Sequence, residues 1–274
     1  MQVSKIFVVI DPTTPNQIAL ARAADIARGT GIDIHAYICI NENYSGVEDS
    51  AAMREAEVAR HEAWLAGLIR PLVDSGLSVT AEVECKDDWR EALAPAAARA
   101  KADLIVKESR RRTPLQRRFL KTADWILLRN VECPVLLVKS LRQGPLTHIL
   151  AAVNLNARDA AHQALTEIVI ESSRALADST GAELHAVNAY ADQMHFVHPP
   201  DLAKRLGIDR ARAHVMQGEP ENVIAEVANN LGSPLVVISS VARRGVSAAI
   251  VGNTAERILD TLDCDVLTII RSPA

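Results

Sequence analysis

The segment Cys133-Pro134-Val135-Leu136-Leu137-Val138 occurs in a second version near the other end of the chain, Cys264-Asp265-Val266-Leu267-Thr268-Ile269. Each version follows an apolar, helix-like sequence. With the two cysteines aligned, apolar residues fall on apolar residues: Leu127 on Ile258, Leu128 on Leu259, Val135 on Val266 and Leu136 on Leu267. A helix-to-strand unit repeated at this distance predicts two domains of one design.

The length of 274 residues suits two domains of ordinary size, and 49% hydrophobic residues are enough for two cores. Aromatic residues make up only 3% of the chain, so Ala, Val, Leu and Ile must fill those cores. We expect one domain over residues 1–141 and the other over residues 145–274. The segment from Lys139 to Leu146, which contains Gly144-Pro145, would be the linker.

Apolar strand-like runs alternate with helical patterns through the first copy. This order predicts right-handed crossovers and a parallel sheet covered on both faces, which is an α/β doubly wound domain. The expected strands are Ile6–Ile10, Ile32–Ile40, Leu77–Cys85, Asp103–Lys107 and Pro134–Val138. The expected helices are one at about Pro15–Arg28, a long one through Trp64 and Ile69 that ends near Pro71 to Gly76, one at Asp88–Ala100, and a last one before the fifth strand.

The second copy repeats that order with a shorter middle section. Tyr190 to Gly207 replaces the much longer Asn41 to Gly76, so its second helix must be shorter. The expected elements are strands at His148–Val153, Ala182–Ala189, Ala211–Met216 and Leu235–Ser239, and helices at Arg158–Ser179 and Pro220–Asn230.

Charge and cysteine usage indicate an ordinary cytoplasmic protein. The net charge of −4 disfavours a nucleic-acid binder with a basic overall balance. No apolar stretch is long enough to span a bilayer, and the first residues lack a charged leader and a cleavage site. The cysteines have no C-x-x-C spacing and at least three lie in apolar runs, so we expect buried thiols rather than disulfides or zinc ligands: Cys39, Cys85, Cys133 and Cys264.

Two segments carry a resemblance to a known family. Ala123-Asp124-Trp125-Ile126-Leu127-Leu128-Arg129 and Gly252-Asn253-Thr254-Ala255-Glu256-Arg257 resemble the universal stress proteins, and within them the tandem two-domain E-type members. The resemblance covers essentially the whole chain. It implies a five-stranded parallel sheet per domain in the order 3-2-1-4-5, a last strand often used for dimerisation, and a role in stress resistance without a general catalytic reaction.

Nucleotide-binding members of that family carry G-x2-G-x9-G-[ST] between the fourth strand and the last helix, and an aspartate after the first strand. Glycines let the backbone approach phosphates, and the N–H groups at the helix start receive the negative charge. The second copy keeps this pattern in part, with Asn154 at the aspartate position and Thr254 beside the hydroxyl position. The remaining candidate residues for ATP or another anion are Ser239, Ala242, Arg243, Arg244, Gly252 and Asn253.

The first copy has lost the same pattern. Its matching residues are Glu108, Arg111, Lys121 and Thr122, so no glycine remains, although Asp11 follows the first strand. We therefore expect no ATP in this copy. Basic residues crowd the segment 107–121, which could neutralise a polyanion, but a solvated basic loop without stacking aromatics is the simpler interpretation.

Other motifs exclude several enzyme classes. The chain has neither G-x-G-x-x-G nor G-x-x-x-x-G-K-[ST], which disfavours dinucleotide dehydrogenases and P-loop NTPases. His195-x-x-His198 precedes two prolines and lacks further ligands, so a surface loop is expected rather than a metal site. His35 and His185 occupy matching strand positions, which predicts a shared packing or hydrogen-bonding role. Trp64, Trp89 and Trp125 lie in helical segments, where packing is their expected role.

The expected function is therefore binding without enzymatic turnover, of a protein partner or a small ligand. The alternative is an ATP-binding switch or weak ATPase that uses the second copy. A hydrophobic-ligand carrier is a third interpretation, prompted by the short Tyr190–Gly207 section. If the sheets meet through Val135–Val138 and Val266–Ile269, each edge protects the other and the chain is a built-in pseudo-dimer. Whether two such chains associate further stays open.

Overall fold

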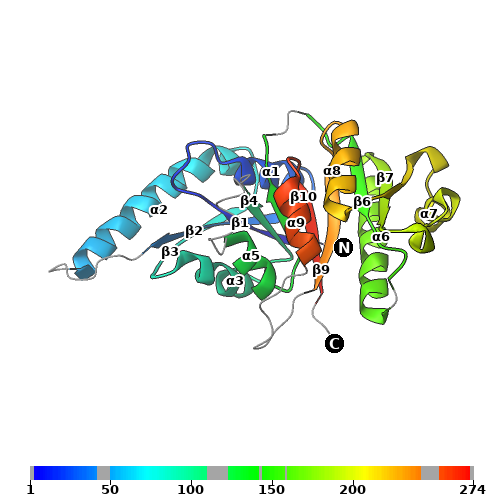
Figure 1. The fold of residues 1–274 in the computed structure, drawn as a ribbon. Coiled ribbons are helices and arrows are strands. Elements are labelled where there is room, and N and C mark those ends of the chain that lie inside the picture. Colours follow the sequence, from blue (N-terminus) through cyan, green and yellow to red (C-terminus); the bar gives the residue numbers. More distant parts are fainter. Residues whose placement is uncertain are drawn as a thin grey trace. The chain divides into compact units, whose positions relative to one another are not determined.

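The structure is a computed structural model, and it describes residues 3–41, 50–109, 123–141, 144–157, 159–241 and 253–271. Contacts within the chain divide these residues into two compact units (Figure 1). The N-terminal unit contains residues 3–109 and 123–133, and the C-terminal unit contains the described residues from 134 onward. The expected domain boundaries at 141 and 145 stay predictions.

The N-terminal unit is an α/β layer structure with a parallel sheet. Its strands pair in the order β3-β2-β1-β4. Helices α1 and α2 lie on one side of this sheet and α3 and α5 on the other (Figure 1), as right-handed crossovers require. The elements are β1 (Lys5–Val9), α1 (Ile18–Ala27), β2 (Asp33–Asn41), α2 (Ser50–Asp74), β3 (Val79–Lys86), α3 (Trp89–Arg99), β4 (Leu104–Glu108) and α5 (Ala123–Asn130).

The C-terminal unit contains the second copy of this pattern. Its own strands pair in the order β8-β7-β6-β9-β10, all parallel, which is the expected order 3-2-1-4-5 of the second repeat. The elements are β6 (His148–Ala152), α6 (Ala160–Thr180), β7 (Glu183–Tyr190), η1 (Gln193–His195), α7 (Pro199–Leu206), η2 (Arg210–Arg212), β8 (Ala213–Gln217), α8 (Pro220–Asn230), β9 (Leu235–Val241), α9 (Asn253–Thr261) and β10 (Val266–Arg271).

The last strand of the first repeat, β5 (Val135–Val138), belongs to the C-terminal unit by its contacts. It pairs antiparallel with β10, with Leu136 opposite Leu267 and Val135 opposite Thr268. The linker continues this junction, because Lys139 donates its backbone N–H to Asp265 Oδ1 at 3.0 Å and its Nζ to Leu262 O at 2.8 Å. The two repeated sequence endings therefore meet each other, as the sequence predicted.

Local sequence explains where the helices begin and end. Asp88 and Asp159 are N-caps whose carboxylates accept from Arg90 N and His162 N, each at 3.0 Å. Gly181 ends α6 with φ of 71°, a left-handed conformation that glycine adopts without strain. The second helix of the second repeat, α7, is much shorter than α2, as expected from the sequence.

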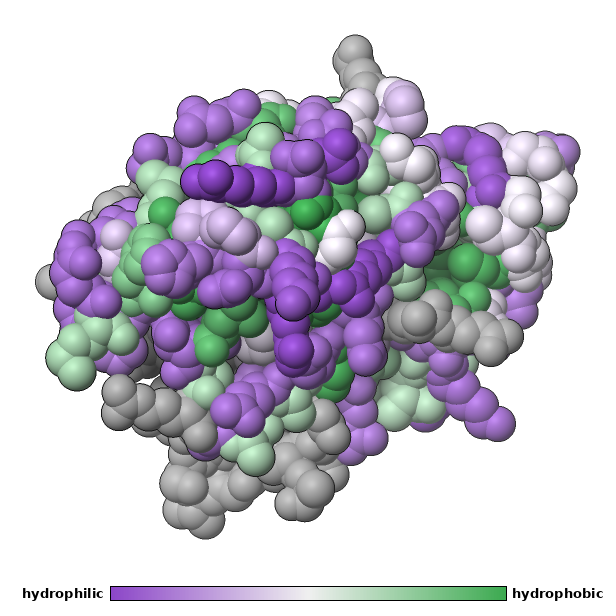
Figure 2. All heavy atoms as spheres, turned by 90° about the vertical axis from the view of Figure 1, so that its right-hand side faces the viewer, coloured by the Kyte–Doolittle hydropathy of each residue, from purple (hydrophilic) through white to green (hydrophobic). Residues whose placement is uncertain are grey.

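Aliphatic side chains from both sides of each sheet form the cores, with few aromatic residues such as Phe7 and Tyr37. On the face drawn in Figure 2, hydrophilic side chains predominate and apolar ones occur in small separate patches. No helix within the described ranges is long and apolar enough to cross a membrane.

None of the four cysteines forms a disulfide, and the expectation of buried thiols holds only in part. Only Cys264 is buried, whereas Cys39, Cys85 and Cys133 are half-buried. Cys39 and Cys85 lie within two residues of the ends of β2 and β3, and Cys133 lies between α5 and β5. An apolar run in the sequence does not distinguish this position from a fully covered one.

Candidate functional site

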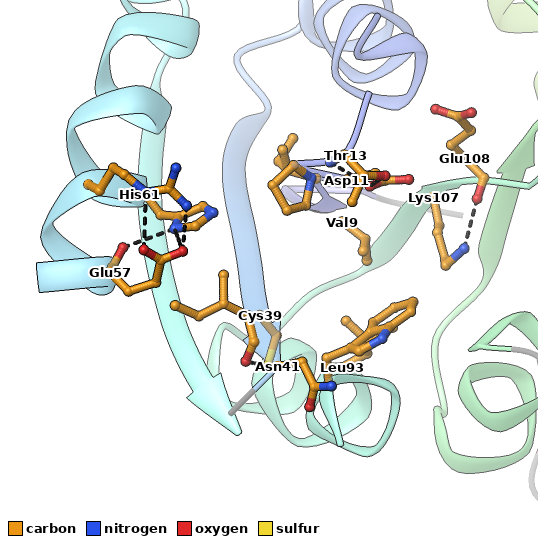
Figure 3. Close-up of a pocket in the computed structure, with 15 residues that line it drawn as sticks. Val9, Asp11, Thr13, Cys39, Asn41, Glu57, His61, Leu93, Lys107 and Glu108 are labelled. Atoms are coloured by element: carbon orange, nitrogen blue, oxygen red, sulfur yellow. Dashed lines mark hydrogen bonds and ion pairs between the residues drawn. The ribbon is translucent and has the colours of Figure 1, made fainter. Parts of the chain in front are cut away.

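A pocket of about 540 Å³ opens in the N-terminal unit at the carboxyl ends of β1, β2 and β4 (Figure 3). The sheet order reverses at β1, between β2 on one side and β4 on the other. Helices leave the sheet in opposite directions at such a point, so the strand ends and helix starts leave a crevice in which open α/β sheets bind ligands. Helices α2 and α3 supply the other walls, through residues such as His61 and Trp89.

Helix α2 contributes a polar wall to this pocket. Glu57, Arg60 and His61 are spaced i, i+3 and i+4, so they share one face of the helix. Arg60 donates both its Nε, at 3.1 Å, and an Nη to the Glu57 carboxylate. The His61 ring is only 13% exposed, and its Nδ1 lies 2.9 Å from Glu57 O. Figure 3 shows Glu57 and His61 on the side of the pocket opposite Lys107 and Glu108.

The loop after β1 forms the second polar element. Asp11 Oδ1 accepts from Thr13 N at 2.9 Å and from Thr13 Oγ1 at 2.5 Å, an Asx-type turn that fixes the carboxylate at the end of the strand. Gln17 Nε2 donates to Asp11 O at 2.7 Å and ties this loop to the start of α1. The side chain of Asp11 is thus placed at the pocket by local hydrogen bonds.

The end of β4 carries a nearly buried ion pair. Lys107 Nζ lies 2.7 Å from Asp124 Oδ1, and their side chains are 12% and 11% exposed. Ser109 Oγ donates to the other carboxylate oxygen at 2.8 Å, and Lys107 Nζ also donates to Glu108 O at 2.7 Å. Asp124 is in the first turn of α5, where a carboxylate is favoured by the helix dipole. These contacts hold the Lys107 side chain in place beside the pocket.

The apolar side of the pocket contains Cys39, Ile40, Leu93 and the ring of Trp89. Burial raises the pKa of the Cys39 thiol to about 11, so the thiol stays protonated at neutral pH. A protonated thiol is a poor nucleophile. Trp89 is not only a packing residue, since its ring lines the pocket and stacks with the Arg90 guanidinium at 5.3 Å from the ring centroid.

The predicted anion site of the second copy is described only in part. Asn154 follows β6, is exposed, and accepts from Asn156 N at 3.0 Å through Oδ1. Ser239 lies on β9 opposite Ile269, and Thr254 is exposed in the first turn of α9. The side chain of Asn253 and the candidates Ala242, Arg243, Arg244 and Gly252 lie outside the described residues, as does the basic segment 110–122 of the first copy.

The structure gives hydrogen-bonding roles to the matched strand histidines. His35 contacts Thr80 Oγ1 at 2.9 Å and Glu82 Oε2 at 3.1 Å. His185 contacts His214 Nε2 at 3.2 Å through Nδ1, and Glu183 Oε1 at 3.1 Å through Nε2.

Burial, then repulsion from His214, lowers the pKa of His185, and burial lowers the pKa of His214. His148 also faces His185, at 5.6 Å between ring centroids, and Arg212 pairs with Glu183 at 3.0 Å. Among the described residues, no three His, Cys, Asp or Glu side chains are arranged to hold a metal ion.

Sequence reasoning placed Asp11 and Glu108 at positions of the lost nucleotide pattern and predicted no site in this copy, so it missed this pocket. It gave no functional weight to Glu57, Arg60 and His61, although three polar residues at helical spacing were a usable signal. Cys39 and Asn41 at the end of β2 could also have been selected, because carboxyl ends of parallel strands meet at one edge of a sheet.

Comparison with known proteins agrees with this architecture. The sequence profile of the universal stress protein family matches residues 2–139 and again residues 146–269. Universal stress protein E of Escherichia coli K12 is 29% identical, over 96% of this chain and 92% of that protein. The Haemophilus influenzae universal stress protein E homolog is 26% identical over 98% of both chains.

Solved structures also show similarity to this chain over nearly its whole length. A functionally unknown protein from Pseudomonas aeruginosa PAO1 is 28% identical, with a TM-score of 0.75 over 98% of this chain and 93% of that one. A universal stress protein from Archaeoglobus fulgidus shares the fold with a TM-score of 0.74 over 97% of this chain and 96% of that one, at 15% identity. Two family matches in tandem, each on one copy of the strand–helix pattern, show that this chain belongs to the universal stress protein family.

Proposed function

We propose that this stress-response protein acts by binding a small organic ligand in the pocket of its N-terminal unit, without turning it over. The pocket itself carries the proposal. Its volume of about 540 Å³ is within the range of small-molecule sites, and it lies where open α/β sheets bind ligands. Its lining combines an apolar side with polar groups fixed by internal hydrogen bonds, such as Asp11 and Glu57.

The states of the reactive groups favour binding over catalysis. The thiol of Cys39 is protonated, because burial raises its pKa to about 11. Lys107 Nζ is already engaged by Asp124 Oδ1 and by Glu108 O, each at 2.7 Å. None of the four cysteines forms a disulfide, which is typical of a reducing compartment and supports action in the cytoplasm.

Native mass spectrometry of freshly purified protein tests the proposal, because it reports any retained ligand. Asn41→Trp places a large ring in the pocket from an exposed position at the end of β2. Asp33→Trp, at the exposed other end of the same strand, is the matched control. We expect a retained mass in the wild type and in Asp33→Trp that is lost in Asn41→Trp. A ligand that Asn41→Trp retains would place binding elsewhere and contradict the proposal.

A second candidate function is nucleotide binding in the C-terminal unit, and Ser240 favours it. Ser240 is 4% exposed at the end of β9, and its hydroxyl has no hydrogen-bond partner among the described residues, which do not include 242–252. With the repeats aligned it matches Ser109, whose hydroxyl donates to Asp124, whereas Ala255 replaces that aspartate. An ATP titration with wild type and Gly252→Asp tests this function. Equal affinity in both would exclude the loop before α9 as the site.

A further inference from the structure

We propose that Nε2 of His61 is a hydrogen-bond acceptor of the N-terminal pocket, and that it selects ligands that combine an apolar ring with an N–H or O–H donor. The ligand class named here rests on the proposed function of the pocket. His61 lines the pocket from α2, together with residues at the carboxyl ends of β1 and β2.

The contacts of Nδ1 decide which ring nitrogen of His61 carries the proton. Nδ1 lies 2.9 Å from Glu57 O, and a carbonyl oxygen can only accept a hydrogen bond. The carboxylate oxygen Glu57 Oε1, at 3.9 Å from Nδ1, is an acceptor as well. The proton of the neutral ring therefore lies on Nδ1, which leaves a lone pair on Nε2.

This second nitrogen opens into the pocket. Nε2 has no hydrogen-bond partner in the described part of the chain, and it is not one of the polar atoms buried completely there. The His61 side chain is only 13% exposed, so the pocket that it lines gives the access. Figure 3 shows the ring directed from α2 across the pocket, towards the side of Asp11 and Thr13. A ligand donor therefore reaches Nε2 without breaking a hydrogen bond of the described residues.

His35 shows how a histidine with a structural role differs in the same unit. Its side chain is 15% exposed, which is close to the value for His61. Both of its ring nitrogens are engaged, however: Nδ1 lies 2.9 Å from Thr80 Oγ1 and Nε2 lies 3.1 Å from Glu82 Oε2. His61 has one nitrogen fixed by its own helix and the other available to a ligand, which is the arrangement that a binding residue needs.

The apolar part of the ligand follows from the other wall of the pocket. Ile40 and Leu93 are buried side chains that line it, and the ring of Trp89 lies beside them. An apolar ring packed against these side chains loses its contact with water, so an N–H or O–H group on that ring needs a partner inside the pocket. The volume of about 540 Å³ has room for a compound of two fused rings.

Calorimetric titration with indole and with benzothiophene tests the selection. The two compounds have nearly the same shape, but only indole has an N–H donor. His61→Phe keeps a ring and removes the acceptor, so the ratio of indole affinity to benzothiophene affinity should fall at least about fivefold. Comparing this ratio between variant and wild type cancels the different hydration of the two compounds. His61→Gln, whose amide oxygen reaches about the position of Nε2, should keep most of the ratio.

Two controls locate the effect. His35→Phe removes a comparably buried imidazole that does not line the pocket, and it should leave the ratio unchanged. Asn41→Trp, which fills the pocket, should abolish the binding of both compounds. An equal ratio in the wild type and in His61→Phe would overturn the inference, as would binding that survives in Asn41→Trp or the failure of both compounds to bind the wild type.

Long-range ¹H–¹⁵N NMR spectra give a readout that does not depend on a ligand. We expect the neutral His61 ring to show a proton on Nδ1, with signals that are assigned by their loss in His61→Phe. A proton on Nε2 would overturn the inference, because that nitrogen would then not accept. Native mass spectrometry separates this result from the proposed function: a retained compound without an N–H or O–H donor would support binding in the pocket and contradict the role of His61.

Discussion

Thr268 offers a stabilising substitution that can be derived from the structure. It lies in the middle of β10, opposite Val135 on one side and Ile238 on the other. The residue is 0% exposed, and within the described part of the chain its hydroxyl has no hydrogen-bond partner. In the first repeat the aligned residue is Leu137, so this strand position accepts an apolar side chain.

We expect Thr268→Val to raise the free energy of unfolding of the C-terminal unit by about 1 kcal/mol. A buried polar group without a partner costs about 1–3 kcal/mol, and valine has nearly the same shape. Some of that gain is lost because neighbouring atoms relax only in part. For a unit of this size, about 1 kcal/mol raises the melting temperature by roughly 3 °C.

Thr166→Val is the matched control in the same unit. Thr166 is 6% exposed on α6, and its Oγ1 donates to Asn154 O at 3.1 Å. The same chemical change should here lower the free energy of unfolding by about 1 kcal/mol. Both variants are compared by urea unfolding, using the transition of the C-terminal unit. The dependence of the free energy of unfolding on urea concentration should be the same in both variants and in the wild type. Destabilisation by Thr268→Val would refute the conclusion that its hydroxyl is unsatisfied.

Three further predictions concern the junction, a histidine pair and a thiol. The double variant Leu136→Asp with Leu267→Asp should markedly lower the melting temperature, because both residues are at most 5% exposed and pair across β5 and β10. Full retention of stability would contradict the pairing of these two strands. Because the pKa values of His185 and His214 are lowered on folding, the unfolded chain takes up protons first as the pH falls below about 6.5. The free energy of unfolding should therefore decrease from about pH 7 to pH 5. His185→Gln should make this pH dependence weaker when the free energy is measured by urea unfolding at each pH. An unchanged pH dependence in the variant would exclude the histidine pair as its source. Alkylation of Cys39 should be slow at neutral pH and accelerate towards its pKa of about 11, and a rate independent of pH in that range would contradict the protonated thiol.

The order and type of the elements follow from the sequence alone. The spacing of apolar residues and the positions of Gly and Pro predict the helix Pro220–Asn230 with its observed bounds, and most strands to within one or two residues. The duplication can also be predicted from the sequence, because the apolar pattern around Cys133 and Cys264 aligns without gaps. These features are local or repeated, so neighbouring residues suffice to specify them.

Only the tertiary structure decided which residues share a site. Asp11, His61 and Lys107 are far apart in the sequence, and they line one pocket because strand pairing and helix packing set their positions. The same holds for the contact between Lys107 and Asp124, which the basic composition of the surrounding segment concealed. A charge pattern gives the sign of each side chain but not its partner. The sequence therefore determined the two-repeat framework, and packing between distant segments determined the pocket and the charge beside it.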